Sequence, residues 1–100
     1  MANAEDVTVT PVKGGVASPE GFLTSAVHCG VKAVASALDL AVLAPDVSAS
    51  AAALFTTNLA QAAPVIVSRE PIEHSGGVAR AIVVNSGCAN ACTGPEGLTH

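Results

Sequence analysis

The apolar part of this sequence consists mainly of small aliphatic side chains, and this limits the core that the chain can build. Of the 100 residues, 20 are Ala and 14 are Val, whereas Leu, Ile, Phe and Met together number 13. A chain of this length buries a smaller share of its surface than a longer one, and small side chains stabilise a core less. We therefore expect one small domain that is marginally stable by itself and that packs against further protein.

The charge and the length of the apolar runs argue against two kinds of partner. The formal net charge is -4 with only 4 Lys and Arg residues, which leaves no broad basic surface for nucleic acid. The longest apolar runs, at 40–44 and 51–55, are far shorter than the ~20 residues of a membrane-spanning helix. No apolar signal region is present near Glu5 and Asp6, and the 3 cysteines make no disulfide framework. We expect a cytoplasmic, reducing environment.

Short segments of apolar and β-branched residues predict several strands. We expect an edge strand at 7–10 and further strands at 38–44, 51–56, 64–68 and 79–85. Helical turns are expected at 58–63 and 70–74, whereas residues 22–34 have no clean period. The pattern favours an α+β fold, with a partial mixed sheet and short helices, over an all-β sandwich.

The last residues have the form of a helix start. Thr93 and Glu96 have the spacing of a capping box, in which Thr93 caps the helix and Glu96 bonds back to its amide, and Pro95 suits the first turn. Only 4 residues follow Glu96, which is too few to recover the cost of helix nucleation. We therefore expect the sequence to be part of a longer polypeptide.

Several blocks of the sequence, most of all one near its end, carry a family likeness. The blocks are Gly21-Phe22, Gly30-Val31-Lys32, Leu38-Asp39-Leu40-Ala41, Ala53-Leu54-Phe55-Thr56-Thr57-Asn58, Ala62-Ala63-Pro64-Val65 and the longest, Ala81-Ile82-Val83-Val84-Asn85-Ser86-Gly87-Cys88-Ala89-Asn90-Ala91-Cys92-Thr93-Gly94. In order and rough spacing they resemble the ornithine acetyltransferase (glutamate N-acetyltransferase) family. Cys88 departs from many relatives, which have Asn or Gly there. The likeness divides the chain into a lead segment, 1–20, and an N-terminal fragment of the α-subunit domain, 21–100, an incomplete portion of that fold.

The resemblance implies an enzyme of arginine biosynthesis that moves an acetyl group from N-acetylornithine to glutamate, in some members also from acetyl-CoA, with no bound cofactor. Members are similar in cutting one precursor into an α and a β subunit, which exposes a nucleophilic threonine. The family's Ser-Thr-Gly oxyanion segment, its substrate lysine and the Lys-Gly stretch before that threonine have no counterpart in this sequence. We expect no catalytic residue here, and partners in the rest of the α subunit and in the β subunit.

Polar residues that follow the 79–85 segment are the candidate substrate contacts. Asn85, Asn90 and Thr93 would lie at the end of a strand, where ligands often bind in α/β sheets, or they would bond to one another in a tight loop. Thr93-Gly94 resembles an oxyanion pair, but the helix-cap interpretation is preferred. A strand end is likewise preferred to a cleavage site at Thr56-Thr57.

The remaining reactive side chains have simple structural interpretations. A His28/Cys29 dyad is disfavoured because neighbours on an extended chain point to opposite faces, and the cysteines Cys29, Cys88 and Cys92 are expected to be small buried hydrophobes, with no metal site. His74 is expected in a solvated turn, and Lys32 and Asp39 either pair or are surface charges. Besides the enzyme fragment, a non-enzymatic binding or assembly module that completes a separately encoded subunit stays open, as does a cysteine-dependent hydrolase.

Overall fold

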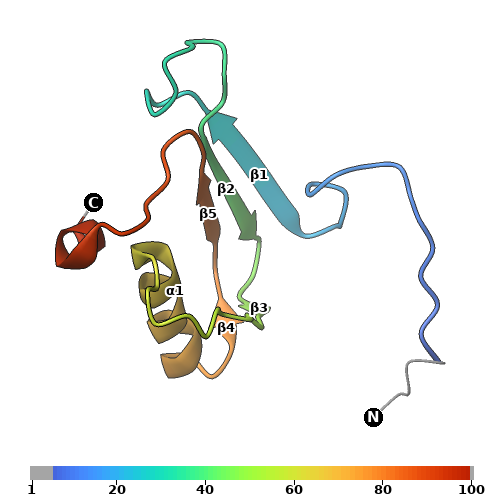
Figure 1. Ribbon diagram of the computed structural model, residues 1–100. Coiled ribbons are helices and arrows are strands. Elements are labelled where there is room, and N and C mark those ends of the chain that lie inside the picture. Colours follow the sequence, from blue (N-terminus) through green and yellow to red (C-terminus); the bar gives the residue numbers. More distant parts are fainter. Residues whose placement is uncertain (1–5, 100) are drawn as a thin grey trace.

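The structure, a computed structural model, describes residues 6–99. Within this range the central sheet consists of β1 (Phe22–Val27), β2 (Leu40–Pro45) and β5 (Ile82–Asn85), in the order β1-β2-β5 (Figure 1). Both pairs are antiparallel, with Val27 opposite Leu40 at one end of the first pair and Leu43 opposite Ile82 in the second. The α+β class and the strands expected at 38–44 and 79–85 are thereby confirmed in their main parts.

The two-residue alternation of a strand gives this sheet two distinct faces. The residues of one face, which we name the Leu43 face, are Phe22, Thr24, Ala26, Ala41, Leu43, Pro45, Ile82 and Val84. The residues of the opposite face, which we name the Val42 face, are Leu23, Ser25, Val27, Leu40, Val42, Ala44, Val83 and Asn85. Both faces are predominantly apolar, so both require cover to be stable in water.

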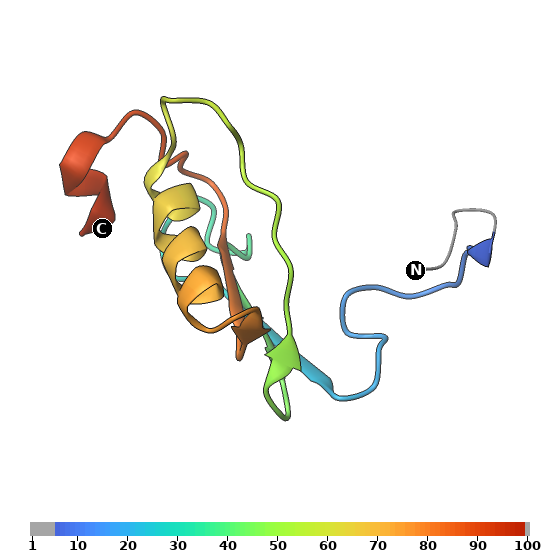
Figure 2. The same cartoon turned by 90° about the horizontal axis from the view of Figure 1, so that it is seen from below.

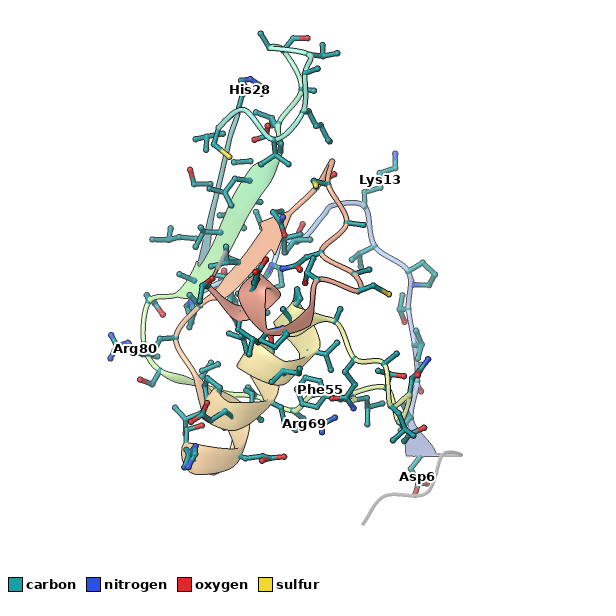
Figure 3. All side chains as sticks on the ribbon, turned by 60° about the vertical axis from the view of Figure 1, so that its left-hand side comes forward. Asp6, Lys13, His28, Phe55, Arg69 and Arg80 are labelled. Atoms are coloured by element: carbon teal, nitrogen blue, oxygen red, sulfur yellow. The ribbon has the colours of Figure 1, made fainter. Side chains whose placement is uncertain are left out.

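A helix and a second, smaller sheet lie beside one end of the central sheet. The helix α1 (Ala63–His74) contacts β4 (Val78–Ala79), which pairs with β3 (Ala49–Ser50). In Figure 2 the helix lies along one side of β5. Arg69 of this helix stacks over the ring of Phe55, with its guanidinium carbon 5.1 Å from the ring centre (Figure 3).

The strand expected at 64–68 is wrong, because this segment is the first half of α1. Its β-branched residues favour a strand locally, but Pro64 suits the first helical turn. Three half-buried side chains, Val65, Arg69 and Ile72, recur at helical spacing and turn toward the rest of the protein. Tertiary packing thus overrides the local preference, and the helical turn expected at 70–74 is confirmed as the second half of the same helix.

Three other expectations about secondary structure are wrong. Residues 7–10 and 51–56 are extended but form no strand ladder, and residues 58–62 form a turn in which the Asn58 side chain accepts the Ala60 N–H at 2.9 Å. A sequence with strand-like composition forms a strand only where a partner supplies the ladder hydrogen bonds. Among the described residues of these segments, Ala51 alone has such a bond, from its N–H to the Gly77 carbonyl at 2.7 Å. Conversely, β1 was not expected, and it forms because β2 pairs with it along its whole length.

The core of this structure is very small. Ala63 is the one buried apolar residue among those described. The chain exposes 8171 Å² of surface, whereas a compact protein of 9.7 kDa exposes about 5,100 Å². Its radius of gyration is 16.5 Å, against about 13 Å for a compact domain of this length, partly because the segment before β1 runs away from the sheet (Figure 1). The expectation of a small core is confirmed.

Candidate functional site

The candidate substrate contacts lie on the segment that leaves β5. Asn85 is the last residue of the strand and is paired with Leu40 of β2. Farther along, the Thr93 hydroxyl donates a hydrogen bond of 2.7 Å to the Asn90 side-chain oxygen. No side-chain hydrogen bond joins Asn85 to either of these two residues in the described part of the chain. The structure therefore brings Asn90 and Thr93 together and leaves Asn85 apart.

The helix start expected after Thr93 is present, but the side-chain hydrogen bond of the expected capping box is not formed by Thr93. Residues Gly94–Leu98 form a short 3-10 helix, η2, with Pro95 in its first turn as expected. The Thr93 side chain makes no cap bond because its hydroxyl is directed to Asn90. Gly97 is buried beneath this pair, and a Cβ at that position would overlap the Thr93 hydroxyl. The absence of a side chain at Gly97 thus allows the pair to form.

A shallow hollow of about 230 Å³ separates η2 from the start of α1. Its lining includes the polar side chains of Gln61 and Thr93, and apolar groups such as Ile66 and Leu98 supply most of the rest. Of the three candidate substrate contacts, Thr93 alone lines it. The hollow is large enough for a small polar molecule or for a side chain from further protein.

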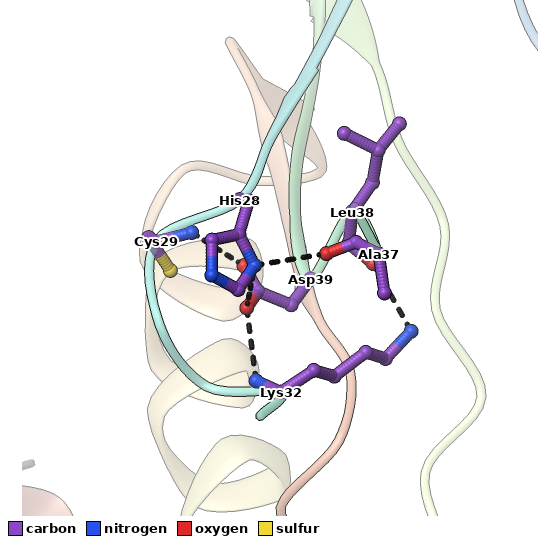
Figure 4. Close-up of polar contacts among 6 residues, drawn as sticks. All are labelled: His28, Cys29, Lys32, Ala37, Leu38 and Asp39. Atoms are coloured by element: carbon purple, nitrogen blue, oxygen red, sulfur yellow. Dashed lines mark hydrogen bonds and ion pairs between the residues drawn. The ribbon is translucent and has the colours of Figure 1, made fainter. Parts of the chain in front are cut away.

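The most organised polar cluster of the structure surrounds Asp39, which sequence reasoning did not select. Its carboxylate is completely buried and accepts the backbone N–H of Cys29 at 2.7 Å and that of Lys32 at 2.9 Å (Figure 4). The His28 ring nitrogen Nδ1 lies 3.2 Å from the second carboxylate oxygen and 3.0 Å from the Ala37 carbonyl. Together these contacts fold residues 28–39 into a loop that joins β1 to β2.

Hydrogen bonds determine the ionisation of this carboxylate. The backbone N–H of Lys32, then that of Cys29, hold the pKa of Asp39 well below its usual range, and they outweigh the opposing effect of desolvation. The Lys32 side chain pairs with no carboxylate of the described residues, and its ammonium donates to the Leu38 carbonyl at 3.0 Å. Lys32 and Asp39 therefore neither form a side-chain pair nor are both surface charges. Instead, the backbone N–H of Lys32 donates to the buried carboxylate of Asp39.

The three cysteines are exposed, so the expectation that they are buried is wrong. All three lie in connecting segments, outside the helices and strands. A hydrogen bond from the Cys29 thiol to the Asp39 carboxylate raises the pKa of that thiol, which makes it a poorer nucleophile at neutral pH. His28 and Cys29 both adjoin Asp39, but the arrangement stabilises the loop rather than a thiolate.

The other reactive residues lie where simple structural roles suffice. His74 is exposed as expected, but it is the last residue of α1 rather than part of a turn, and its ring bonds to the Glu70 carbonyl at 3.1 Å. The Thr56 hydroxyl accepts the Asn58 N–H at 3.2 Å, as in a local turn. Among the described residues, no group of three or more His, Cys, Asp or Glu side chains could hold a metal ion, and no helix is long and apolar enough to cross a membrane.

One signal in the sequence could have revealed the Asp39 cluster. Asp39 is an acidic residue between Leu38 and Leu40 in an otherwise apolar run, and a charged residue in such a place is buried only if it has partners. Its partners are backbone amides, which no residue type identifies. The loop that supplies them therefore could not be recognised from composition.

Comparisons with known proteins agree with this partial fold. The chain is 54% identical over 82 residues to the mitochondrial arginine biosynthesis bifunctional protein ArgJ of Coprinopsis cinerea, covering 80% of this chain and 17% of that protein. It is 47% identical over 87 residues to the ArgJ of Shouchella clausii, covering 87% of this chain and 21% of that protein. The chain thus spans about a fifth of the length of these curated relatives.

Two solved structures share the fold. The ArgJ of Bacillus halodurans superposes with a TM-score of 0.76 at 45% identity, covering 86% of this chain and 44% of that one. The ornithine acetyltransferase of Mycobacterium tuberculosis, complexed with ornithine, superposes with a TM-score of 0.72 at 44% identity, covering 85% and 43%. The model of the ArgJ family matches residues 23–100, most of the sequence. The resemblance to ornithine acetyltransferases is thereby confirmed, and the chain belongs to the ArgJ family.

Proposed function

We propose that this chain supplies the N-terminal part of an ornithine acetyltransferase that transfers an acetyl group from N-acetylornithine to glutamate in arginine biosynthesis. The supporting observation is the superposition on the Bacillus halodurans ArgJ over 86% of this chain at 45% identity. The ornithine bound to the related Mycobacterium tuberculosis enzyme supports the choice of substrate. Acetyl-CoA is a further acetyl donor for the complete enzyme, and we propose no bound cofactor.

The proposed chemistry requires groups that this sequence does not supply. In the first half-reaction a threonine hydroxyl attacks the acetyl carbonyl, donors stabilise the negative oxygen, and the ornithine amine leaves with a proton. In the second half-reaction the glutamate amine attacks the acetyl-threonine and the hydroxyl is regenerated. We propose that this chain contains neither that threonine nor the Ser-Thr-Gly donors, because no part of its sequence resembles those segments. The Asp39 cluster, which lies beside the Cys29 thiol, raises the pKa of that thiol. The chain is therefore expected to be inactive alone.

Asn90 and Thr93, and more weakly Asn85, are proposed as contacts to substrate in the complete enzyme. Thr93 lines the hollow between η2 and α1, and its hydroxyl is held by Asn90. The hydrogen bond between Thr93 and Asn90 can also serve only to hold the loop after β5. Substrate binding by these residues is therefore tested in the complete enzyme. We propose a cytoplasmic location, although the Coprinopsis cinerea relative is described as mitochondrial.

A second candidate function is that of an assembly module that completes a separately supplied remainder, made of the rest of the α subunit and the β subunit. It is favoured by the exposed surface of 8171 Å², which exceeds that of a compact protein of this mass by roughly 3,000 Å². Both candidate functions predict that the chain binds this remainder. Only the enzyme-fragment function requires that binding also restores acetyl transfer.

The test is an assay of ornithine formation from N-acetylornithine and glutamate. The purified chain should give no ornithine above background, whereas the chain co-expressed with the rest of the Bacillus halodurans ArgJ polypeptide should form it. Turnover by the chain alone that is lost when one of its residues is substituted would refute the proposal. A complex that forms but yields no ornithine would favour the assembly module.

A further inference from the structure

The loop that joins β1 to β2, residues 28–39, packs against the segment that leaves β5. The Ser86 N–H donates to the Asp39 carbonyl at 2.9 Å and extends the pairing of β2 with β5 by one residue. The next residue, Gly87, lies so close to Lys32 that a Cβ at Gly87 would stand 2.5 Å from the Lys32 Cγ and 3.5 Å from its Cε. The methylene stem of Lys32 therefore covers the first residue after this pairing.

Two hydrogen bonds hold Lys32 at both ends of its stem. Its backbone N–H donates to the buried carboxylate of Asp39 at 2.9 Å, and its ammonium donates to the Leu38 carbonyl at 3.0 Å (Figure 4). Lys32 is half-buried, so its stem packs against the chain while its charged end stays near solvent. Val31 adds a methyl group that would lie 3.5 Å from a Cβ at Gly87. The loop thus presents a fixed apolar surface to Gly87.

Gly87 is the point at which the chain turns from β5 toward the candidate substrate contacts. Its φ of 112° lies in a region that side chains with a Cβ rarely adopt. Glycine also permits many other backbone conformations, so its presence alone does not fix this one. Residues 87–92, all of them described, make one hydrogen bond, which the Asn90 side chain accepts from the Thr93 hydroxyl. The direction of this segment therefore depends on what holds its start, which is the Lys32 stem.

We propose that Lys32 is a positioning residue for substrate binding: its stem, held at both ends and resting on Gly87, determines where Asn90 and Thr93 lie. The inference rests on the proposed function, in which Asn90 and Thr93 contact substrate. Lys32 acts through Gly87 and not by touching the substrate, because its ammonium is directed to the Leu38 carbonyl.

Two substitutions of Lys32 separate the stem from the charge. Lys32→Ala removes both, whereas Lys32→Met keeps an unbranched stem as far as Cε and removes only the ammonium. Both are made in a joined chain, in which residues 21–100 replace the similar segment of the Bacillus halodurans ArgJ. Lys32→Ala should raise KM for N-acetylornithine by about tenfold and change kcat by less than about twofold, because misplaced contacts weaken the bound substrate and the transition state alike. Lys32→Met should keep both constants within about twofold of the unsubstituted joined chain.

Gly87→Ala is a second variant, which leaves Lys32 intact. The added methyl group would overlap the Lys32 stem, so it displaces the segment and should again raise KM for N-acetylornithine by about tenfold. Combined with Lys32→Ala, it should raise KM further by less than about threefold, because the overlapping Cγ is then absent.

Nuclear magnetic resonance of the 100-residue chain measures the segment without catalysis. With Lys32→Ala, the amide order parameters of Cys88, Ala89 and Asn90 should fall from about 0.85, typical of a rigid backbone, to below about 0.6, and with Lys32→Met they should not. The amides of Val83 and Val84 are the control, because pairing with β2 holds them in both variants.

Each outcome has a definite meaning. Equal losses with Lys32→Ala and Lys32→Met would show that the ammonium acts, and would overturn the proposal. A lower kcat with unchanged KM in both Lys32→Ala and Gly87→Ala, or no change in either constant, would also overturn it. A joined chain that forms no ornithine would reject the proposed function, and the order parameters then decide separately whether Lys32 positions the segment: a fall with Lys32→Ala alone supports this, and equal values in the two variants refute it.

Discussion

The close packing around Gly97 allows one substitution to be worked out in detail. An added Cβ would overlap the Thr93 hydroxyl, would lie 2.7 Å from the Thr93 Cβ and would lie 3.1 Å from the Asn90 side-chain oxygen. Rotation of the Thr93 side chain moves its oxygen but leaves its Cβ, so the backbone of η2 must shift. Gly97→Ala should therefore open this segment.

The expected cost combines three effects. Overpacking costs about 1–3 kcal/mol, and loss of the Thr93–Asn90 hydrogen bond costs about 0.5–1.5 kcal/mol. Alanine regains up to ~1 kcal/mol through its greater helical preference. The net is a destabilisation of about 2 kcal/mol, which corresponds to roughly a thirtyfold change in the opening equilibrium.

Amide hydrogen exchange measures this opening locally. The Thr99 N–H donates to the Glu96 carbonyl at 3.1 Å at the end of η2, so its exchange reports the integrity of that helix. Gly97→Ala should speed its exchange about thirtyfold, or to the unprotected limit. Gly15→Ala is the control, because a Cβ there would meet nothing within 4 Å.

A double-mutant cycle identifies the cause. In a Thr93→Gly background the overlapping atoms are gone, so Gly97→Ala should have no effect on exchange or should slow it. An equal acceleration in both backgrounds would refute the steric reasoning.

Two further predictions concern Asp39. Hydrogen bonds lower its pKa in the folded chain, so its stabilising effect is fully present above the unfolded value of about 4 and is lost progressively as the pH falls from that value toward the lowered pKa of the folded chain. The urea midpoint of the natural chain should thus exceed that of Asp39→Asn at neutral pH, and the difference should shrink near pH 3; an unchanged difference would exclude a role for the charge. Asp39→Asn should also speed alkylation of Cys29 by iodoacetamide, because the carboxylate raises the pKa of that thiol, while Cys88 should react as before. Equal acceleration at Cys29 and Cys88 would instead indicate general loosening.

The sequence predicts best where local composition and tertiary pairing agree. The expected strands at 38–44 and 79–85 correspond to β2 and β5, because apolar, β-branched runs bounded by turn residues also find partners. The segment at 64–68 has similar composition but becomes helical, since Pro64 begins a helix whose half-buried residues face the rest of the chain. Residues 51–56 form no strand, since the Ala51 N–H, which donates to the Gly77 carbonyl, is the one backbone amide of this segment with a ladder-like hydrogen bond among the described residues.

The candidate site was predicted only in part, because its location follows from local sequence whereas its contacts follow from tertiary pairing. Polar residues after a strand were identifiable, and Asn90 and Thr93 do contact each other. Asn85 remains apart from them, because its place at the end of β5 is determined by pairing with Leu40. Whether these three residues contact substrate stays a prediction.

The sequence by itself determined the family, through blocks such as 81–94, and the α+β class, through runs whose character is local. It also determined that the core would be small, because side-chain volume is a property of composition. The tertiary structure alone decided which strands pair, which side chain lies against Gly87 and which backbone amides surround Asp39. These features depend on groups far apart in the chain or on backbone atoms common to nearly all residues, so no local pattern of side chains encodes them.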